Sequence, residues 1–192
     1  MRIITGSARG RNLRTLEGMH TRPTTDKVKQ AMFNVVQYDI EGRQVLDLFG
    51  GSGQLGLEAA SRGAAAVTIV ENDRKAQQII GENIRTCKLE DRCRLVAGDG
   101  ITYLGRQKKE SFDLIFLDPP YGGMLLNRAL AEICRIDILR QGGIILCESA
   151  AEDKLDELPH PYQVQKTYRY GRICLTVVTK EQYENSSGNR KF

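Results

Sequence analysis

The sequence has few of the residues that build metal sites, disulfide frameworks or membrane spans. It contains two histidines and five cysteines, and no two cysteines form a Cys-x-x-Cys pair. We therefore expect no metal site and interpret the cysteines as reduced thiols. No run of about 18 apolar residues occurs, which argues against a membrane-spanning helix. The first residues lack an apolar signal core, so we expect a cytoplasmic protein without a membrane partner.

The net charge is small but unevenly distributed. The 192 residues suffice for one domain, or for a domain with a small appendage, and carry a formal charge of +4. Residues 1–30 alone contain seven Lys or Arg against two Asp or Glu. Such a basic region suits phosphate contacts, although it is equally typical of a solvated surface. We divide the chain into a basic hairpin (1–22), a main domain (23–182) and a polar tail (183–192).

The order of apolar runs predicts an α/β fold with a mostly parallel sheet. Several runs, such as 67–70 and 144–147, are apolar at successive positions, which is typical of parallel strands covered by helices on both faces. At the end of the chain, 162–170 and 172–180 should form two antiparallel strands joined at Gly171. The predicted strands are 44–49, 66–71, 94–97, 112–118 and 143–148, and the predicted helices are 24–37, 54–62, 73–88, 100–107, 124–135 and 151–157. An amino-terminal hairpin over 1–20 completes the pattern.

A glycine-rich turn follows the first predicted strand and is typical of a nucleotide site. Gly51–Gly56 fits the dinucleotide pattern G-x-G-x-x-G, and Glu71 lies 20 residues after Gly51, where an acid can hold ribose hydroxyls. A nicotinamide cofactor is therefore one interpretation. Asp47 argues against it, because a carboxylate beside the loop would repel a pyrophosphate.

A cofactor with an amino-acid end and a nucleoside end fits these acids better. Asp47 suits an α-ammonium group, Glu71 suits ribose hydroxyls, and Asp99 can accept from an adenine amine or simply cap the next helix. These features indicate S-adenosylmethionine. The predicted cofactor-binding residues are Asp47, Phe49, Gly50, Gly51, Ser52, Gly53, Glu71, Asn72, Asp99 and Gly100.

The four residues Asp118, Pro119, Pro120 and Tyr121 form a motif directly after a buried apolar run. The prolines fix φ and remove two N–H donors, which leaves a platform that offers acceptors only. The NH2 group of a nucleobase donates two hydrogens, and a tyrosine ring can stack on its flat face. We predict that this tetrad is catalytic. The alternative is a proline-stiffened turn.

With these motifs in place, the chain resembles the bacterial 16S ribosomal RNA guanine-N2 methyltransferase family. The tetrad alone is shared with many amino-group methyltransferases, and the basic amino-terminal segment followed by Arg-Pro-Thr narrows the family. The matching stretches are Arg2–Gly6 with Arg9–Arg11, Arg22–Val28, Asp47–Gly53 with Leu55–Ala59, and Asp118–Tyr121.

The resemblance implies a class I methyltransferase (Rossmann-like) fold whose last strand runs antiparallel, with S-adenosylmethionine as the methyl donor and a guanine of ribosomal RNA, naked or in a partly assembled small subunit, as the acceptor. Two alternatives remain: an adenine-N6 methyltransferase, and a non-catalytic RNA-binding assembly factor. We expect RNA phosphates to contact Arg2, Arg9, Arg11, Arg14 and Arg22. Arg22 could instead close over the cofactor.

Overall fold

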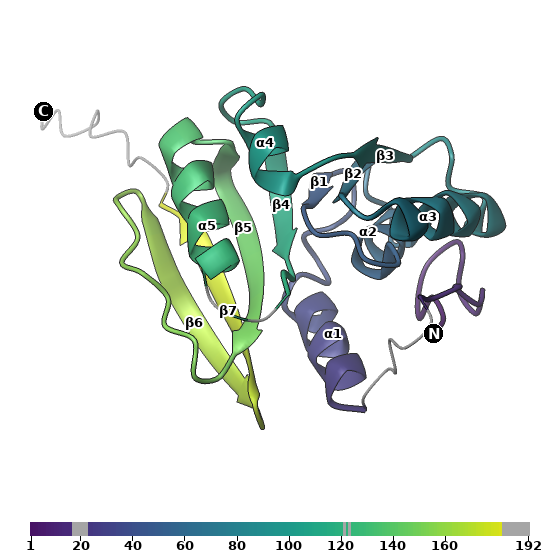
Figure 1. Cartoon of the computed structure of the whole chain (residues 1–192), viewed down its shortest axis with the longest axis horizontal. Coiled ribbons are helices and arrows are strands. Elements are labelled where there is room, and N and C mark those ends of the chain that lie inside the picture. The colour runs from purple at the N-terminus through teal and green to yellow at the C-terminus, as the bar shows by residue number, and fades with distance from the viewer. Residues whose placement is uncertain (17–22, 121, 123, 182–192) are drawn as a thin grey trace, which may run out of the picture.

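A single seven-stranded sheet organises the molecule (Figure 1). The computed structural model describes residues 1–16, 23–120, 122 and 124–181, with 23–26 described by their backbone alone. The strand order is β3-β2-β1-β4-β5-β7-β6. The strands are β1 (Gln44–Asp47), β2 (Ala66–Glu71), β3 (Cys93–Ala97), β4 (Phe112–Leu117), β5 (Leu139–Ala150), β6 (Tyr162–Tyr170) and β7 (Ile173–Lys180).

Within the described residues, six strands of the sheet point in the same direction and β7 points in the opposite direction. Strands β3, β2, β1, β4 and β5 pair in parallel, and β7 inserts antiparallel between β5 and β6. The predicted mostly parallel sheet with an antiparallel last strand is confirmed. After β3 the chain returns to the middle of the sheet and adds β4 on the other side of β1. The direction in which strands are added therefore reverses between the neighbouring strands β1 and β4. Ligands bind at the carboxyl ends of the strands at such a switch point.

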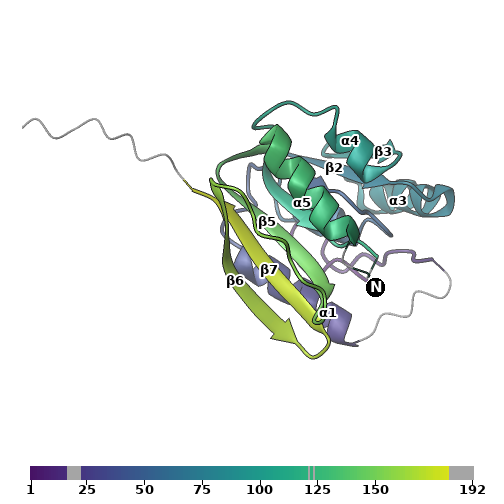
Figure 2. The ribbon, with the colours of Figure 1, turned by 60° about the vertical axis from the view of Figure 1, so that its left-hand side comes forward.

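Helices cover both faces of the sheet, as its apolar strands require (Figure 2). The helices are α1 (Pro23–Val35), α2 (Gln54–Ser61), α3 (Arg74–Cys87), α4 (Gly100–Leu104) and α5 (Met124–Ile136). Neighbouring strand residues point to opposite faces. Val45 therefore packs in the core with α1, α2 and α3, whereas Leu46 packs in the core with α4 and α5.

Two predicted elements differ in the structure. The helix expected over 151–157 does not form: residues 151–152 make a turn after β5, and 153–159 form a loop without regular secondary structure. Leu155 and Leu158 of this loop pack against the core that contains α5, which does not require a helix. The arms of the amino-terminal hairpin do run antiparallel, but they pair through one bridge, Arg2 with Asn12, and not as long strands.

The amino-terminal segment, residues 1–16, packs against α2 and α3. Ile3, Ala8 and Leu13 are buried in the same core as these helices. The carboxylate of Glu58 accepts hydrogen bonds from the backbone N–H groups of Ile4 and Thr5, at 2.7 and 3.1 Å. No helix among the described residues has the length and apolar character needed to cross a bilayer.

Candidate active site and cofactor loop

Asp47 and Asp118 meet at the switch point of the sheet. Asp47 is the last residue of β1 and lies in register with Phe116 of the neighbouring strand β4. Asp118 follows Leu117, the last residue of β4. The two carboxylates are close enough for the negative charge of Asp118 to help raise the pKa of Asp47. The structure thus brings together two acids that are 71 positions apart in the sequence.

Asp47 is a buried acid with an unsatisfied oxygen. The residue is 1% exposed. Its Oδ2 accepts a hydrogen bond of 2.9 Å from the backbone N–H of Gly56. Its Oδ1 has no hydrogen-bond partner among the described residues. Burial is the main cause that raises the pKa of Asp47 from 3.8 to about 7, against the lowering effect of the Gly56 N–H. A buried polar atom without a partner is rare in folded proteins.

The glycine-rich loop, residues 50–53, turns sharply over this acid. Gly51 and Gly53 adopt φ values of +55° and +79°, a region that favours glycine. Gly50 is buried, and a Cβ there would lie 2.5 Å from the side chain of Ile69, so this glycine permits close packing of the loop on β2. Ser52 is buried, and Phe49 before the loop is half-buried.

Glu71, at the end of β2, joins the glycine-rich loop to the start of α3. Its Oε2 accepts from the N–H of Gly51 at 2.7 Å, and its Oε1 accepts from the N–H groups of Asn72 and Asp73 at 2.7 and 2.8 Å. The predicted acid therefore lies beside the loop. In this arrangement it holds the loop backbone, and Asn72 is exposed next to it.

Asp99 lies after β3 at the same edge of the sheet. Its Oδ1 accepts from the backbone N–H and the hydroxyl of Thr102, at 2.7 and 2.8 Å, and so caps α4. These hydrogen bonds lower the pKa of Asp99. Gly100, the next residue, is buried, and a Cβ there would meet the backbone oxygen of Leu48 at 3.1 Å. The structure shows the capping role, which the sequence had offered as the alternative.

The tetrad begins inside the site and ends at its surface. Asp118 is half-buried, Pro119 is buried and Pro120 is exposed. Tyr121 lies outside the described residues. Burial raises the pKa of the Asp118 carboxyl, and the positive charge of Lys29 lowers it. Asp118 directly follows the central strand β4 and lies next to a buried acid, so its backbone position is set by the sheet.

Two residues that were not predicted from the sequence, Lys29 and Asn83, connect the helices around the site with each other and with the glycine-rich loop. The ammonium group of Lys29 on α1 donates a 2.8 Å hydrogen bond to Oε1 of Gln54, the first residue of α2. Asn83 on α3 is buried and donates to the carbonyl oxygens of Ser52 and Arg14, at 2.9 and 3.0 Å. Both residues lie within helices predicted from the sequence, but periodicity does not reveal where a polar side chain reaches.

The predicted RNA-contacting arginines have different surroundings. Arg2 and Arg9 are exposed. Arg11 donates to the carbonyl oxygen of Thr86 at 2.7 Å, and Arg14 forms an ion pair with Glu82. Arg22 lies outside the described residues. Arg2 and Arg9 thus have the greater freedom to contact a phosphate.

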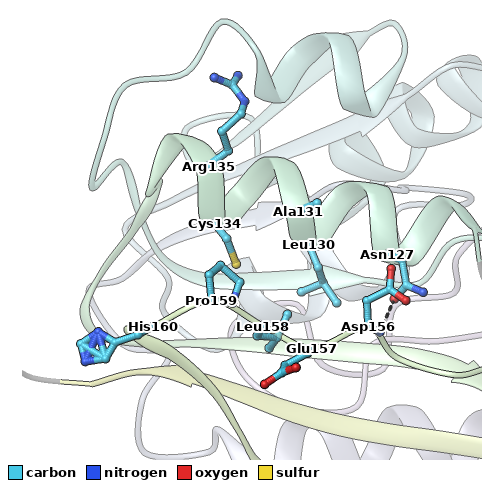
Figure 3. A pocket seen from close by; sticks show the side chains of 10 residues that line it. All are labelled: Asn127, Leu130, Ala131, Cys134, Arg135, Asp156, Glu157, Leu158, Pro159 and His160. Carbon is cyan, nitrogen blue, oxygen red and sulfur yellow. Dashed lines mark hydrogen bonds between the residues drawn. The ribbon is translucent and has the colours of Figure 1, made fainter.

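A separate hollow lies between α5 and the segment 156–160 (Figure 3). Its volume is about 400 Å³, and neither the tetrad nor the glycine-rich loop lines it. The side chains of Arg135 and His160 point away from its centre (Figure 3). Within the described residues there is also no cluster of three His, Cys, Asp or Glu that could hold a metal ion. The hollow is therefore not part of the site at the switch point.

The switch-point residues are chemically suited to S-adenosylmethionine. The unpartnered Oδ1 of Asp47 is an acceptor below the loop, consistent with an ammonium-bearing ligand that is held directly or through water. Gly51 leaves open space where a side chain would stand, so a ligand can approach its backbone. At the neighbouring strand end, Oε2 of Glu71 accepts one hydrogen bond, from Gly51, and can accept a second one.

A sheet of this order, with β7 inserted antiparallel and a glycine-rich loop after β1, defines the class I methyltransferases. The solved structures that this chain resembles have the same fold. One of them, from Escherichia coli and provisionally described as a methyltransferase, superposes with a TM-score of 0.83 at 33% identity. The match covers 94% of this chain and 98% of that one.

The family is established over nearly the whole chain. Residues 1–179 match the family model described as conserved hypothetical protein 95, and the chain belongs to that family. Ribosomal RNA small subunit methyltransferase D of Escherichia coli K12 is 33% identical, over 98% of this chain and 94% of its own length. The protein of the same name from Haemophilus influenzae is 34% identical, over 81% of each chain. The family predicted from the sequence is confirmed.

Proposed function

We propose that this chain transfers a methyl group from S-adenosylmethionine to the exocyclic N2 amine of a guanine in 16S ribosomal RNA. The observation that carries the proposal is the meeting of Asp47 and Asp118 at one switch point. Relatives named ribosomal RNA small subunit methyltransferase D support this class of substrate. They match more than four fifths of the chain, which favours this function over an adenine-N6 methyltransferase or a non-catalytic assembly factor.

The cofactor would lie on the glycine-rich loop, between the ends of β1, β2 and β3. Asp47 would face its ammonium group, Glu71 its ribose hydroxyls and Asp99 its adenine amine, each through a carboxylate oxygen. When bound, it supplies a methyl group already activated by a sulfonium. The protein then has mainly to align the two reacting atoms, which can contribute about 7–11 kcal/mol.

The tetrad would hold the target base. The N2 lone pair of guanine is delocalised into the ring, so the nitrogen is a poor nucleophile. Asp118 and the carbonyl oxygen of Pro119 would accept the two amine hydrogens and favour the positive charge that develops on the nitrogen. Tyr121 would stack on the base after it leaves its helix. Asp118 need not be a strong base, since the proton can leave after transfer.

The amino-terminal segment would contact RNA phosphates. Arg2 and Arg9 are exposed and belong to a segment that is fixed on α2 and α3. Replacing both with Gln should weaken RNA binding and reduce the slope of log affinity against log salt by about one for each arginine. The pair Arg106→Gln and Lys108→Gln, exposed residues after α4, is the control. An unchanged slope would exclude this segment as an RNA surface.

The direct test is methylation of small-subunit RNA from cells that lack the protein. Naked 16S RNA and partly assembled subunits are incubated with labelled S-adenosylmethionine, digested to nucleosides and analysed by mass. We expect N2-methylguanosine from at least one substrate and at a single position. N6-methyladenosine in its place would support the adenine alternative. No incorporation with either substrate, despite cofactor binding, would overturn the proposal.

A further inference from the structure

A buried side chain, Asn83 on α3, connects the amino-terminal segment with the glycine-rich loop. Its Oδ1 accepts a 2.8 Å hydrogen bond from the backbone N–H of Arg14. Its Nδ2 donates to the carbonyl oxygen of Arg14 at 3.0 Å and to that of Ser52 at 2.9 Å. Arg14 belongs to the segment that we expect to contact RNA, and Ser52 belongs to the loop that we expect to hold the cofactor. The two surfaces therefore share one side chain.

These contacts use most of the hydrogen-bonding capacity of the Asn83 amide. An amide group has two N–H donors and one oxygen that accepts, and here the nitrogen and the oxygen both have backbone partners. Because Asn83 is only 1% exposed, solvent would not replace a partner that is lost. A buried donor or acceptor without a partner is costly. A movement of the Arg14 backbone would therefore break a hydrogen bond with Asn83 or shift the amide relative to Ser52.

The glycine-rich loop is anchored at two neighbouring residues. Oε2 of Glu71 accepts from the N–H of Gly51 at 2.7 Å, and Asn83 donates to the carbonyl oxygen of the next residue, Ser52. Ser52 is 8% exposed, and its hydroxyl lies 4.0 Å from the sulfur of Met1. The first anchor comes from β2, whereas the second joins the loop to the amino-terminal segment. A ligand that fixes the loop therefore also restricts residues 1–16.

The amino-terminal segment has a second attachment, which does not reach the loop. The hydroxyl of Ser61 donates to the carbonyl oxygen of Thr5 at 2.6 Å and accepts from the N–H of Ala8 at 2.9 Å. Ser61 is the last residue of α2, whereas the glycine-rich loop precedes the first residue of this helix, Gln54. Ser61 therefore offers a matched control, because its loss loosens the same segment and leaves the contacts of Asn83 in place.

We propose that Asn83 is a positioning residue that couples RNA binding on residues 1–16 to cofactor binding on residues 50–53, so that each ligand strengthens the binding of the other. This inference rests on the proposed function, which supplies both ligands. The ligand that binds first orders the segment and the loop together, so the second ligand has less disorder to remove. The coupling must be equal in both directions, and we expect a factor of about five, at the lower end of typical couplings.

The first test compares RNA affinity with and without saturating S-adenosylhomocysteine, the cofactor without its methyl group. The RNA is naked 16S RNA or partly assembled subunits, whichever the native protein binds more tightly. The native protein and Ser61→Ala should each bind RNA about fivefold more tightly when the cofactor analogue is present. Asn83→Leu has no polar group for these contacts, and the hydroxyl of Asn83→Ser has one donor for two carbonyl oxygens, so neither variant should gain affinity.

The ratio of the two affinities separates coupling from a structural role. A structural loss at Asn83 would weaken RNA binding equally with and without the cofactor analogue, and would leave the fivefold ratio unchanged. If Asn83→Leu does not fold, the smaller change Asn83→Ser decides the question. A ratio near one in the native protein, or a ratio near five in a folded Asn83 variant, would overturn the proposal.

The second test needs no RNA, so it separates a failure of this inference from a failure of the proposed substrate. Amide hydrogen exchange at Arg14 is measured by NMR, and calorimetry measures the binding of S-adenosylhomocysteine in the same samples. Binding should slow exchange at Arg14 in the native protein and in Ser61→Ala, and not in the Asn83 variants. Exchange that is unchanged in the native protein, or slowed in the Asn83 variants, would overturn the coupling role even if the native protein methylates RNA.

Discussion

Buried and half-buried acids at the two edges of the sheet differ in their partners. At the amino edge, where the parallel strands begin, the acids are matched with cations. Asp113 accepts from the N–H of Gln44 at 2.8 Å and from Arg140 at 2.9 Å. Asp137 contacts Lys180 at 2.8 Å and Lys109 at 3.1 Å. Burial acts to raise the pKa of Asp137, but hydrogen bonds from Lys180 and Tyr162 hold it below its usual value.

At the carboxyl edge the balance is reversed. Asp47 keeps an oxygen without a partner, and the pKa values of Asp47 and Asp118 are raised, in both cases mainly by burial. A buried acid without a matched cation is costly. The contacts at the amino edge therefore stabilise the fold, whereas Asp47 and Asp118 at the carboxyl edge are left to be satisfied by ligands. Perturbed acids in a crevice are typical of functional sites.

The largest effect should come from replacing Lys180, which contacts the acids of the amino edge. Its side chain is 1% exposed and contacts Asp137, Glu110 and the carbonyl oxygen of Leu139. Lys180→Met would remove a buried ammonium group from the half-buried Asp137 and from the carbonyl oxygen of Leu139, and should lower the free energy of unfolding by about 3–5 kcal/mol, measured by urea denaturation. Lys154→Met, at an exposed lysine, should change it by less than about 0.5 kcal/mol. A cost below about 1 kcal/mol for Lys180→Met would contradict a stabilising amino edge.

Asp118→Ala should have the next largest effect, on catalysis and not on stability. Losing one preorganised partner of the developing charge typically lowers turnover about 10²–10³-fold. Cofactor affinity should stay within about threefold, because the role proposed for Asp118 is to bind the target base and not the cofactor. The variant should be no less stable than the native protein, since a costly acid has been removed. Single-turnover rates, calorimetry and urea denaturation measure the three quantities. Turnover near the native level would exclude the role of the tetrad.

Asp47→Asn should increase stability in neutral solution. The folded-state pKa of about 7 lies above the usual 3.8, so the native state holds its proton more tightly and loses stability as the pH rises from about 4 to 7. This difference corresponds to about 4 kcal/mol, from which an unpaired amide in place of Oδ1 subtracts about 1–3 kcal/mol. We expect a gain of about 1–3 kcal/mol at pH 8.

The pH dependence is the control for Asp47→Asn. Between pH 4 and pH 7 the native protein should lose more stability than the variant, because Asp47 titrates there in the native protein and the asparagine of the variant does not titrate. Asp113→Asn at the amino edge should have the opposite sign, since it weakens contacts with Arg140 and Arg43. If both variants proved equally destabilising at pH 8, the contrast between the edges would fail.

Most of the fold, and the location of the acids, could be predicted from the sequence. Successive apolar positions placed the central strands, and parallel strands bring their carboxyl ends to one edge, so Asp47, Glu71, Asp99 and Asp118 were expected near one another. Hydrogen-bond partners were not predictable in this way. Glu71 binds loop N–H groups, and Lys29 reaches Gln54. Such contacts depend on side-chain directions that no periodicity encodes, as does the pairing of Lys180 with Asp137.

The smallest effect should come from Arg140→Met, which tests whether the amino edge is stabilised by the number of its contacts or by their burial. The Arg140 side chain is 44% exposed, so its 2.9 Å contact with Asp113 is partly screened by water. Asp113 would keep the N–H of Gln44 and the more distant Arg43. We expect a loss of less than about 1 kcal/mol, reduced further in 1 M salt because the Debye length falls to about 3 Å. A loss as large as that of Lys180→Met would show that the number of contacts matters more than burial, and burial alone would then not set Asp47 and Asp118 apart from the acids of the amino edge.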